Sequence, residues 1–276
     1  MKTILKLMTP MMLWALLFTS CEKKDQDNQL NEEQTQQMII STEDHATADD
    51  LFQDIEDRVD EAIETRGADN DCPVVWASPD WQTFPRTVTI DFGDECVGPD
   101  GRTRQGKIIV EVTDNILNPQ ASRTATLDNF FIDDVKIEGS RTWTNQGYDA
   151  DGNITLLRTV RNGKIIYPNG EEAEWDSEVL LTQTAGGNTP LNFFDNVFEM
   201  TGTAAGINRN GRAYEVFIES PLVLDKICPW LVSGIFTLTV DNVDVSVNYG
   251  TGNCDNKAML TLPNGTQQEI VIGRWW

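Results

Sequence analysis

The side chains that most often carry chemistry are scarce in this chain of 276 residues. It contains a single histidine, His45, and five cysteines. A Ser/His/Asp or Cys/His centre needs a histidine beside its nucleophile, and His45 lies in a polar segment that we expect to be outside the folded part. The sequence therefore predicts no catalytic centre that depends on histidine, and no histidine ligand for a metal.

Carboxylates are the one plentiful reactive group. The chain has 44 Asp and Glu residues, and two carboxylates suffice for the acid–base hydrolysis of glycosides. No spacing singles out such a pair, because most of these acids fall at positions typical of solvated sheet faces and turns. A carboxylate-dependent glycan hydrolase remains an alternative, but we favour a protein that is not an enzyme and assign no catalytic residue.

The segment YDADGNI places Asp149, Asp151 and Asn153 at alternate positions, as in the first half of a calcium loop. An EF-hand loop also needs a bidentate glutamate at its twelfth position, and Val160 occupies that position here. A hairpin turn therefore explains the segment better. The sequence predicts no metal site and no cofactor.

Four of the cysteines are predicted to form two disulfides. No two cysteines stand at CxxC spacing, so neither a zinc site nor a thioredoxin-like centre is indicated. Pairing is the default in an oxidising compartment, and four cysteines allow three connectivities. We favour Cys72–Cys96 and Cys228–Cys254, because each pair brackets what the sequence indicates to be one local hairpin.

The fifth cysteine, Cys21, ends an apolar N-terminal run. Two lysines, an apolar stretch and small residues precede it, which is the pattern of a secretory signal peptide over residues 1–20. The run is too short to span a bilayer as a helix. Phe18-Thr19-Ser20-Cys21 resembles a bacterial lipobox, in which the thiol is acylated and the chain is cut before it. Cys21 is thus the predicted lipid attachment site, and an ordinary signal peptide with a chance cysteine is the alternative.

Residues 21–45 are rich in Gln, Asn, Asp and Glu and poor in apolar residues. A segment of this composition cannot bury enough surface to fold, so we expect a flexible tether between the lipid and the folded domain. The formal net charge of the chain is −23. This charge argues against nucleic acid as a partner, because binding it requires cations that displace counterions.

The folded domain is predicted over residues 46–276, and its first element is a helix over residues 48–66. One face of that helix is acidic, and the other is an apolar stripe at helical spacing. The stripe contains Leu51, Phe52, Ile55, Val59, Ala62 and Ile63. Thr47 is the expected N-cap, and Gly67 is expected to close the helix. Because a flexible tether has no use for an apolar stripe, we expect this helix to pack on a sheet.

From Cys72 onwards the apolar period becomes two, as in Val88-Ile90-Phe92, which is typical of an antiparallel sheet with one wet face. Six Asn-Gly or Asp-Gly pairs, among them Asn162-Gly163, are expected at hairpin turns. The similar segments IEGS, MTGT and VSGI, which begin at positions 137, 200 and 232, fit equivalent strands with a central glycine bulge, and chance similarity is the alternative. We predict an all-β fold of ten or more strands, either a large antiparallel sheet or a β-sandwich, with the N-terminal amphipathic helix packed on it.

Tryptophans beside Asp and Asn often stack on sugars, but Trp also buries well in sheets. Trp143 and Trp175 lie in alternating segments and are expected in the core. Trp81, Trp275 and Trp276 are less constrained, and we favour packing over sugar binding for them as well.

Four segments, TVTIDFGDEC, GPDGRTRQGKIIV, GINRNGRAY and YGTGNCDNKAMLTLPNG, resemble an uncharacterised family of Bacteroidota outer-membrane lipoproteins over roughly residues 46–273. The run CEKKD at residues 21–25 resembles the charged stretch that directs such lipoproteins to the cell surface. The family has no established activity, so the resemblance implies location and architecture and transfers no catalytic residue. We expect a lipid-anchored surface protein with a binding or structural role, whose partners are the membrane and a glycan or envelope protein.

Overall fold

The computed structural model describes residues 32–67, 72–189 and 195–272, which form one β-sheet wrapped around one α-helix. The elements are α1 (Glu32–Thr65), β1 (Val74–Ser78), β2 (Arg86–Val97), β3 (Thr103–Val112), β4 (Ser122–Ile132), β5 (Val135–Tyr148), β6 (Ile154–Ile166), β7 (Glu172–Ala185), β8 (Val197–Ile207), β9 (Ala213–Asp225), β10 (Leu231–Val240), β11 (Val243–Thr251), β12 (Lys257–Thr261) and β13 (Gln267–Val271).

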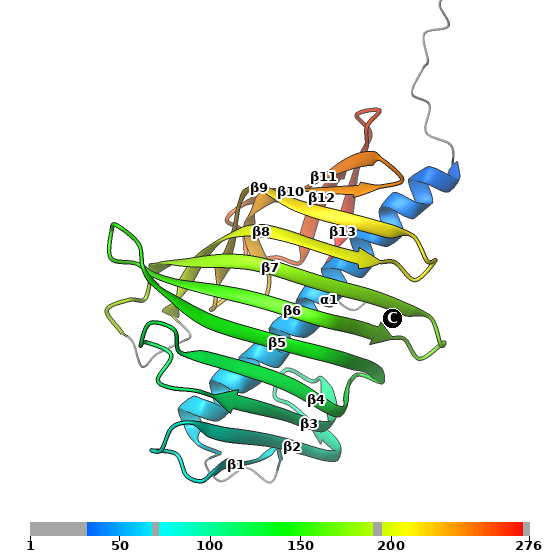
Figure 1. Ribbon diagram of the computed structural model, residues 1–276. Coiled ribbons are helices and arrows are strands. Elements are labelled where there is room, and N and C mark those ends of the chain that lie inside the picture. The colour runs from blue at the N-terminus through cyan, green and yellow to red at the C-terminus, as the bar shows by residue number, and fades with distance from the viewer. Residues whose placement is uncertain (1–31, 68–71, 190–194, 273–276) are drawn as a thin grey trace, which may run out of the picture.

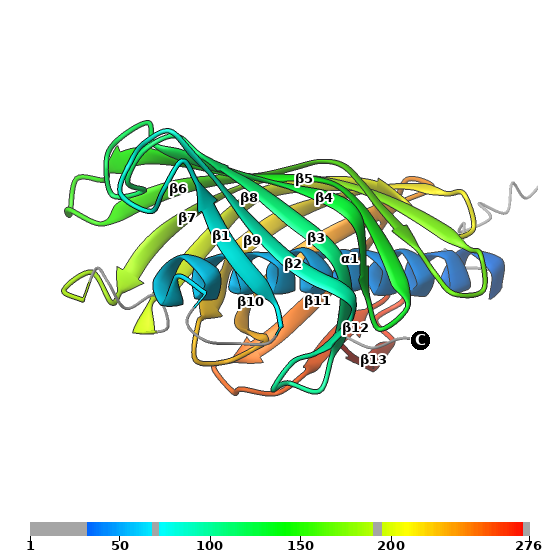
Figure 2. The same cartoon turned by 90° about the horizontal axis from the view of Figure 1, so that it is seen from below.

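The thirteen strands pair in the order of the sequence, and each is antiparallel to the next. Figure 1 shows the strands crossing the helix one after another, and Figure 2 shows the sheet curving so that the helix lies in its trough. The prediction of an all-β fold with one packed helix is confirmed, in the form of a single large sheet.

Glycine bulges accompany this curvature. Gly139, Gly202 and Gly234 have φ values of 115°, 144° and 110°, and the pairing register shifts beside each of them. A Cβ at Gly202 would lie 2.2 Å from the carbonyl oxygen of Glu178. Bulges bend a strand and increase its twist, so these glycines help to curl the sheet around the helix. The glycine bulge predicted in each of the three segments is confirmed.

Five of the six predicted Asn-Gly and Asp-Gly turns join consecutive strands, and the sixth prediction was wrong. Asn162-Gly163 lies inside β6, where Asn162 has φ of 53° and the register shifts against β7. The carbonyl of Asn162 lies 2.7 Å from the place a Cβ would take on Gly139 in the neighbouring strand. Asn tolerates the left-handed conformation in a bulge as it does in a turn, so the dipeptide alone could not separate the two.

The helix is longer than predicted, because α1 begins at Glu32 and not near residue 48. Residues 32–45, which the sequence indicated to be tether, are therefore helical, and Thr47 is a buried mid-helix residue and not a cap. From residue 38 to residue 62 no helical residue is exposed. The predicted end is confirmed, because Gly67 has φ of 70° beyond the last turn. Residues 1–20 and Cys21 lie outside the described residues.

Most acidic side chains between residues 44 and 60 of α1 are paired with bases of the sheet and its turns. We call these contacts the helix–sheet ion pairs: Asp44–Arg209, Asp49–Arg158, Asp50–Arg102, Asp54–Arg104, Glu56–Arg141, Asp57–Lys226 and Asp60–Arg123. Several of these side chains are almost fully buried, with Arg104 and Arg141 each 1% exposed. A buried charge strongly destabilises a protein unless an opposite charge pairs with it. Because its acids are paired, the polar sequence of α1 is compatible with a place in the core.

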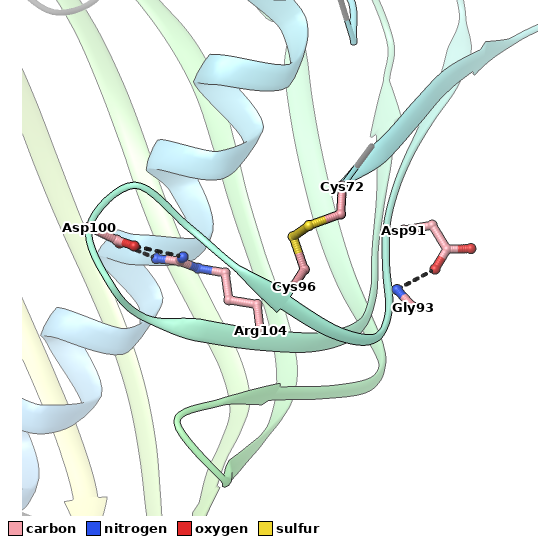
Figure 3. Close-up of a disulfide and its surroundings, with 6 residues drawn as sticks. All are labelled: Cys72, Asp91, Gly93, Cys96, Asp100 and Arg104. Atoms are coloured by element: carbon pink, nitrogen blue, oxygen red, sulfur yellow. Dashed lines mark hydrogen bonds and ion pairs between the residues drawn. A yellow bond between two sulfur atoms is a disulfide. The ribbon is translucent and has the colours of Figure 1, made fainter. Parts of the chain in front are cut away.

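Two disulfides link connections of the sheet, with the connectivity that the sequence predicted. Cys72 is bonded to Cys96 and Cys228 to Cys254, across Cα–Cα distances of 5.8 and 5.7 Å. Figure 3 shows the first of these bonds holding the start of β1 against the end of β2. In the following turn, Arg104 forms two hydrogen bonds with Asp100, at 2.6 and 3.2 Å.

Candidate functional site

A cavity of about 530 Å³ lies between the C-terminal half of α1 and the ends of strands β5 to β9. The β5–β6 turn and the end of β7 form its mouth, and the connection from β3 to β4 forms one side. Its charged, aromatic, apolar and amide-bearing lining includes Asp60, Ile116, Leu117, Arg123, Trp143, Tyr148, Asn153, Ile154, Leu156, Gln183, Asn188, Asn196, Phe198 and Lys226. This cavity has the size and the mixed lining of a small-molecule pocket.

Its charged side is built from the helix–sheet ion pairs. Asp60 accepts hydrogen bonds from Arg123 at 3.0 Å and from Lys226 at 3.1 Å, and Lys226 also donates to Asp57 at 2.6 Å. Burial disfavours the ammonium of Lys226, but the carboxylates of Asp60 and Asp57 raise its pKa above the ordinary value. Lys226 therefore keeps its positive charge although its side chain is only 4% exposed.

Aromatic and aliphatic side chains form the opposite wall. The rings of Trp143 and Phe198 meet edge to face with centroids 6.2 Å apart, and Ile154 and Leu156 lie on the neighbouring strand β6. Trp143 is 5% exposed, yet its indole Nε1 has no hydrogen-bond partner among the described residues. The prediction that Trp143 and Trp175 are core residues is confirmed, and Trp143 lines the cavity as well.

Amide side chains stand between these walls and the mouth. Gln183 donates to Asn196 at 2.7 Å, and Asn153 lies in the β5–β6 turn. Asp149 organises that turn by accepting bonds from the backbone N–H groups of Asp151 and Asn153 at 2.9 and 2.8 Å. The YDADGNI segment is therefore the hairpin turn that the sequence predicted.

The arrangement can bind a molecule but offers no pair of catalytic carboxylates. Among the described residues that line the cavity, Asp60 is the only acid, and it is engaged by two cations. A glycoside hydrolase needs a second carboxyl group facing the first. Within residues 32–67, 72–189 and 195–272, no cluster of three His, Cys, Asp or Glu side chains could hold a metal ion.

His45 lies in the core and not in a tether, so the reason for setting it aside was wrong. Its Nδ1 accepts a hydrogen bond from Nε1 of Trp175 at 3.0 Å, and the ring meets Phe236 edge to face. Burial lowers the pKa of His45 to about 4, so the ring is neutral at pH 7. We interpret His45 as a packed and hydrogen-bonded core residue.

The sequence analysis did not identify the buried bases of the sheet, of which Arg123 lines the cavity, although a signal was present. Arg123, Arg141 and Arg158 occupy the inward phase of their strands, in line with Ala125, Trp143 and Val160 respectively. A strand arginine in the apolar phase indicates a buried acidic partner, since an unpaired charge is costly in the core. Trp81, in contrast, is partly buried against the core as favoured, and Trp275 and Trp276 lie outside the described residues.

Comparison with known proteins adds no relative: no family model, no curated protein and no solved structure matches this chain. In the described part of the chain, no helix is both long enough and apolar enough to cross a membrane. The fold and the cavity are therefore the basis for a functional proposal.

Proposed function

We propose that this chain is a lipid-anchored, non-enzymatic protein of the bacterial outer membrane that binds a small molecule or the end of a glycan at the cell surface. The cavity of about 530 Å³ carries the binding part of the proposal, because it combines a buried charged group, an aromatic wall and amide side chains in one place. Most small-molecule sites have this combination of an apolar wall and a few polar groups.

Support for the anchor comes from the sequence at Cys21. The lipobox-like run at residues 18–21 follows a basic and apolar leader, and the resemblance to Bacteroidota lipoproteins points the same way. A change of Cys21 to Ser removes the thiol, and we expect the protein to leave the membrane fraction. If the Cys21→Ser protein stays with membranes after a wash at high pH, the anchor proposal is wrong.

Blocking the cavity tests the binding part. Gly187 lies at the mouth without a left-handed backbone, and a Cβ there would meet its nearest atom, Oε1 of Gln183, at an ordinary 3.7 Å. Gly187→Trp should therefore fill the mouth while the fold stays intact. Thr266→Trp, in the exposed β12–β13 turn, is the matched control.

Glycans, metabolites and envelope extracts would be screened for binding to the wild type and to both variants. We expect ligands that raise the melting temperature of the wild type and of Thr266→Trp but not of Gly187→Trp. A ligand set that shifts all three proteins equally would mean that the cavity is not the binding site.

A further inference from the structure

We propose that the ligand of this cavity is a small organic anion, whose acidic group lies against Lys226, Arg123 and Trp143 and whose apolar or ring-shaped body lies against the opposite wall. This proposal rests on the proposed function, because it takes the cavity to be a binding site. It adds the chemical class of the ligand.

Unused hydrogen-bond donors are the first observation. An ammonium has three N–H groups, and Lys226 uses two of them on Asp57 and Asp60. The indole N–H of Trp143 has no partner in the described part of the chain, although the residue is buried. A buried donor without an acceptor costs free energy, so a ligand that brings acceptor oxygens relieves a cost that the protein alone carries.

Positive charge favours an acceptor that is itself ionised. Lys226 and Arg123 line the cavity with one acid, Asp60, while Asp57 contacts Lys226 without lining it. Hydrogen bonds from charged donors to charged acceptors are about twice as strong as those between neutral groups.

The rest of the wall fits the body of such a molecule. Leu117, Ile154 and Phe198 provide apolar contact, while Asn153 and Gln183 can meet hydroxyl groups nearer the mouth. An acid on a sugar ring, an aryl ring or a short alkyl chain would match this division into a charged end and an amphipathic side.

The test compares each acid with a neutral counterpart of the same shape, by calorimetric titration of the full-length chain in detergent micelles. The first pair is phenyl β-D-glucuronide and phenyl β-D-glucoside, and the second is 4-phenylbutyrate and 4-phenylbutanamide. We expect the acid of at least one pair to bind about tenfold or more tightly than its neutral partner, as a charge-assisted bond predicts.

Variants then assign the preference to named groups. Lys226→Met should abolish the difference between acid and neutral probe, whereas Lys107→Met, which removes a lysine that is 40% exposed, should leave it unchanged. Trp143→Phe should lower the affinity for the acid about tenfold, which is the loss expected when one hydrogen bond to a charged group is removed. Because the lost N–H has no partner among the residues that the structure describes, this variant should stay folded.

The outcomes separate the ligand class from the function. Equal affinity for acid and neutral probe in both pairs overturns the anion and leaves the binding function in place. If neither acid binds, the anion proposal is also overturned. The ligand screen with Gly187→Trp then tests the binding function independently. If Lys226→Met fails to fold, an unchanged affinity of Trp143→Phe for the acid is sufficient to overturn the proposal.

Discussion

Replacing Asp44 with Ala tests whether the polar first half of α1 belongs to the fold. Asp44 is fully buried and accepts three hydrogen bonds, from Tyr167 Oη at 2.9 Å and from the backbone N–H and Nε of Arg209, both at 2.7 Å. Asp44→Ala leaves the hydroxyl of Tyr167 buried without this acceptor and removes the main partner of Arg209. Breaking a buried charge pair in this way costs about 3–5 kcal/mol.

The same substitution at Asp91 is the matched control. Asp91 also combines an ion pair, with Lys107 at 2.7 Å, and a backbone hydrogen bond, from Gly93 at 3.0 Å, but its side chain is 25% exposed and that of Lys107 is 40% exposed. Exposed pairs contribute about 0–1 kcal/mol. Figure 3 shows Asp91 beside Gly93, on β2.

Thermal unfolding followed by circular dichroism measures the difference. For a protein of this size, each kcal/mol lowers the melting temperature by about 2–4 °C. We therefore expect Asp44→Ala to melt about 6–20 °C below the wild type, and Asp91→Ala at most about 4 °C below it. Equal shifts in the two variants would refute the reasoning, because the buried ion pair in residues 32–45 would then contribute no more to stability than an exposed ion pair does.

Three further predictions concern pH, backbone conformation and the disulfides. In the folded protein His45 has a pKa of about 4, against an ordinary 6.5, so the unfolded chain binds the proton first as pH drops. The free energy of unfolding should therefore fall by about 3 kcal/mol between pH 6.5 and pH 4. Subtracting the urea-unfolding pH profile of His45→Gln from that of the wild type should isolate this loss, and parallel profiles would contradict it. Gly202→Ala should lower the free energy of unfolding by about 1–3 kcal/mol, because it forces a Cβ into a left-handed bulge, while Gly187→Ala should change it by less than about 0.5 kcal/mol. Removing Cys72–Cys96, which closes a loop with a sequence separation of 24, should cost about 3–4 kcal/mol in denaturant titrations, and a loss below 1 kcal/mol would contradict this estimate.

The strands could be predicted from the sequence because their pattern is local. Val88, Ile90 and Phe92 alternate with polar residues, and all three are buried on one face of β2. The pattern did not reveal how thirteen strands curve, but the glycines at 139 and 202 carried part of that information. Hence the fold class could be predicted from short segments of sequence, whereas the curvature that forms the trough depends on all the strands together.

The first half of the helix and the cavity could not be predicted, because they depend on distant partners. Asp44 is polar and yet fully buried, since its partners Tyr167 and Arg209 stand 123 and 165 residues further along the chain. Composition therefore suggested a tether where the protein has a core helix. Similarly, Lys226 and Arg123 become a site only when the ends of separate strands meet at Asp60.

The helix–sheet ion pairs also determine where along the trough the helix comes to rest. The apolar stripe of α1 repeats every turn with side chains of similar bulk, such as Leu51, Ile55 and Val59, so a slip of one turn, about 5.4 Å, would exchange one aliphatic contact for another. The acids repeat only in part. The same slip would bring Ile40 or Ala48 to the place of Asp44, and His45 or Gln53 to the place of Asp49, which leaves the buried bases Arg209 and Arg158 without their carboxylates. Among the possible positions of the helix along the trough, one therefore has a much lower free energy than the others. This mismatch penalty gives the long helix a single longitudinal alignment, which apolar packing alone would leave degenerate.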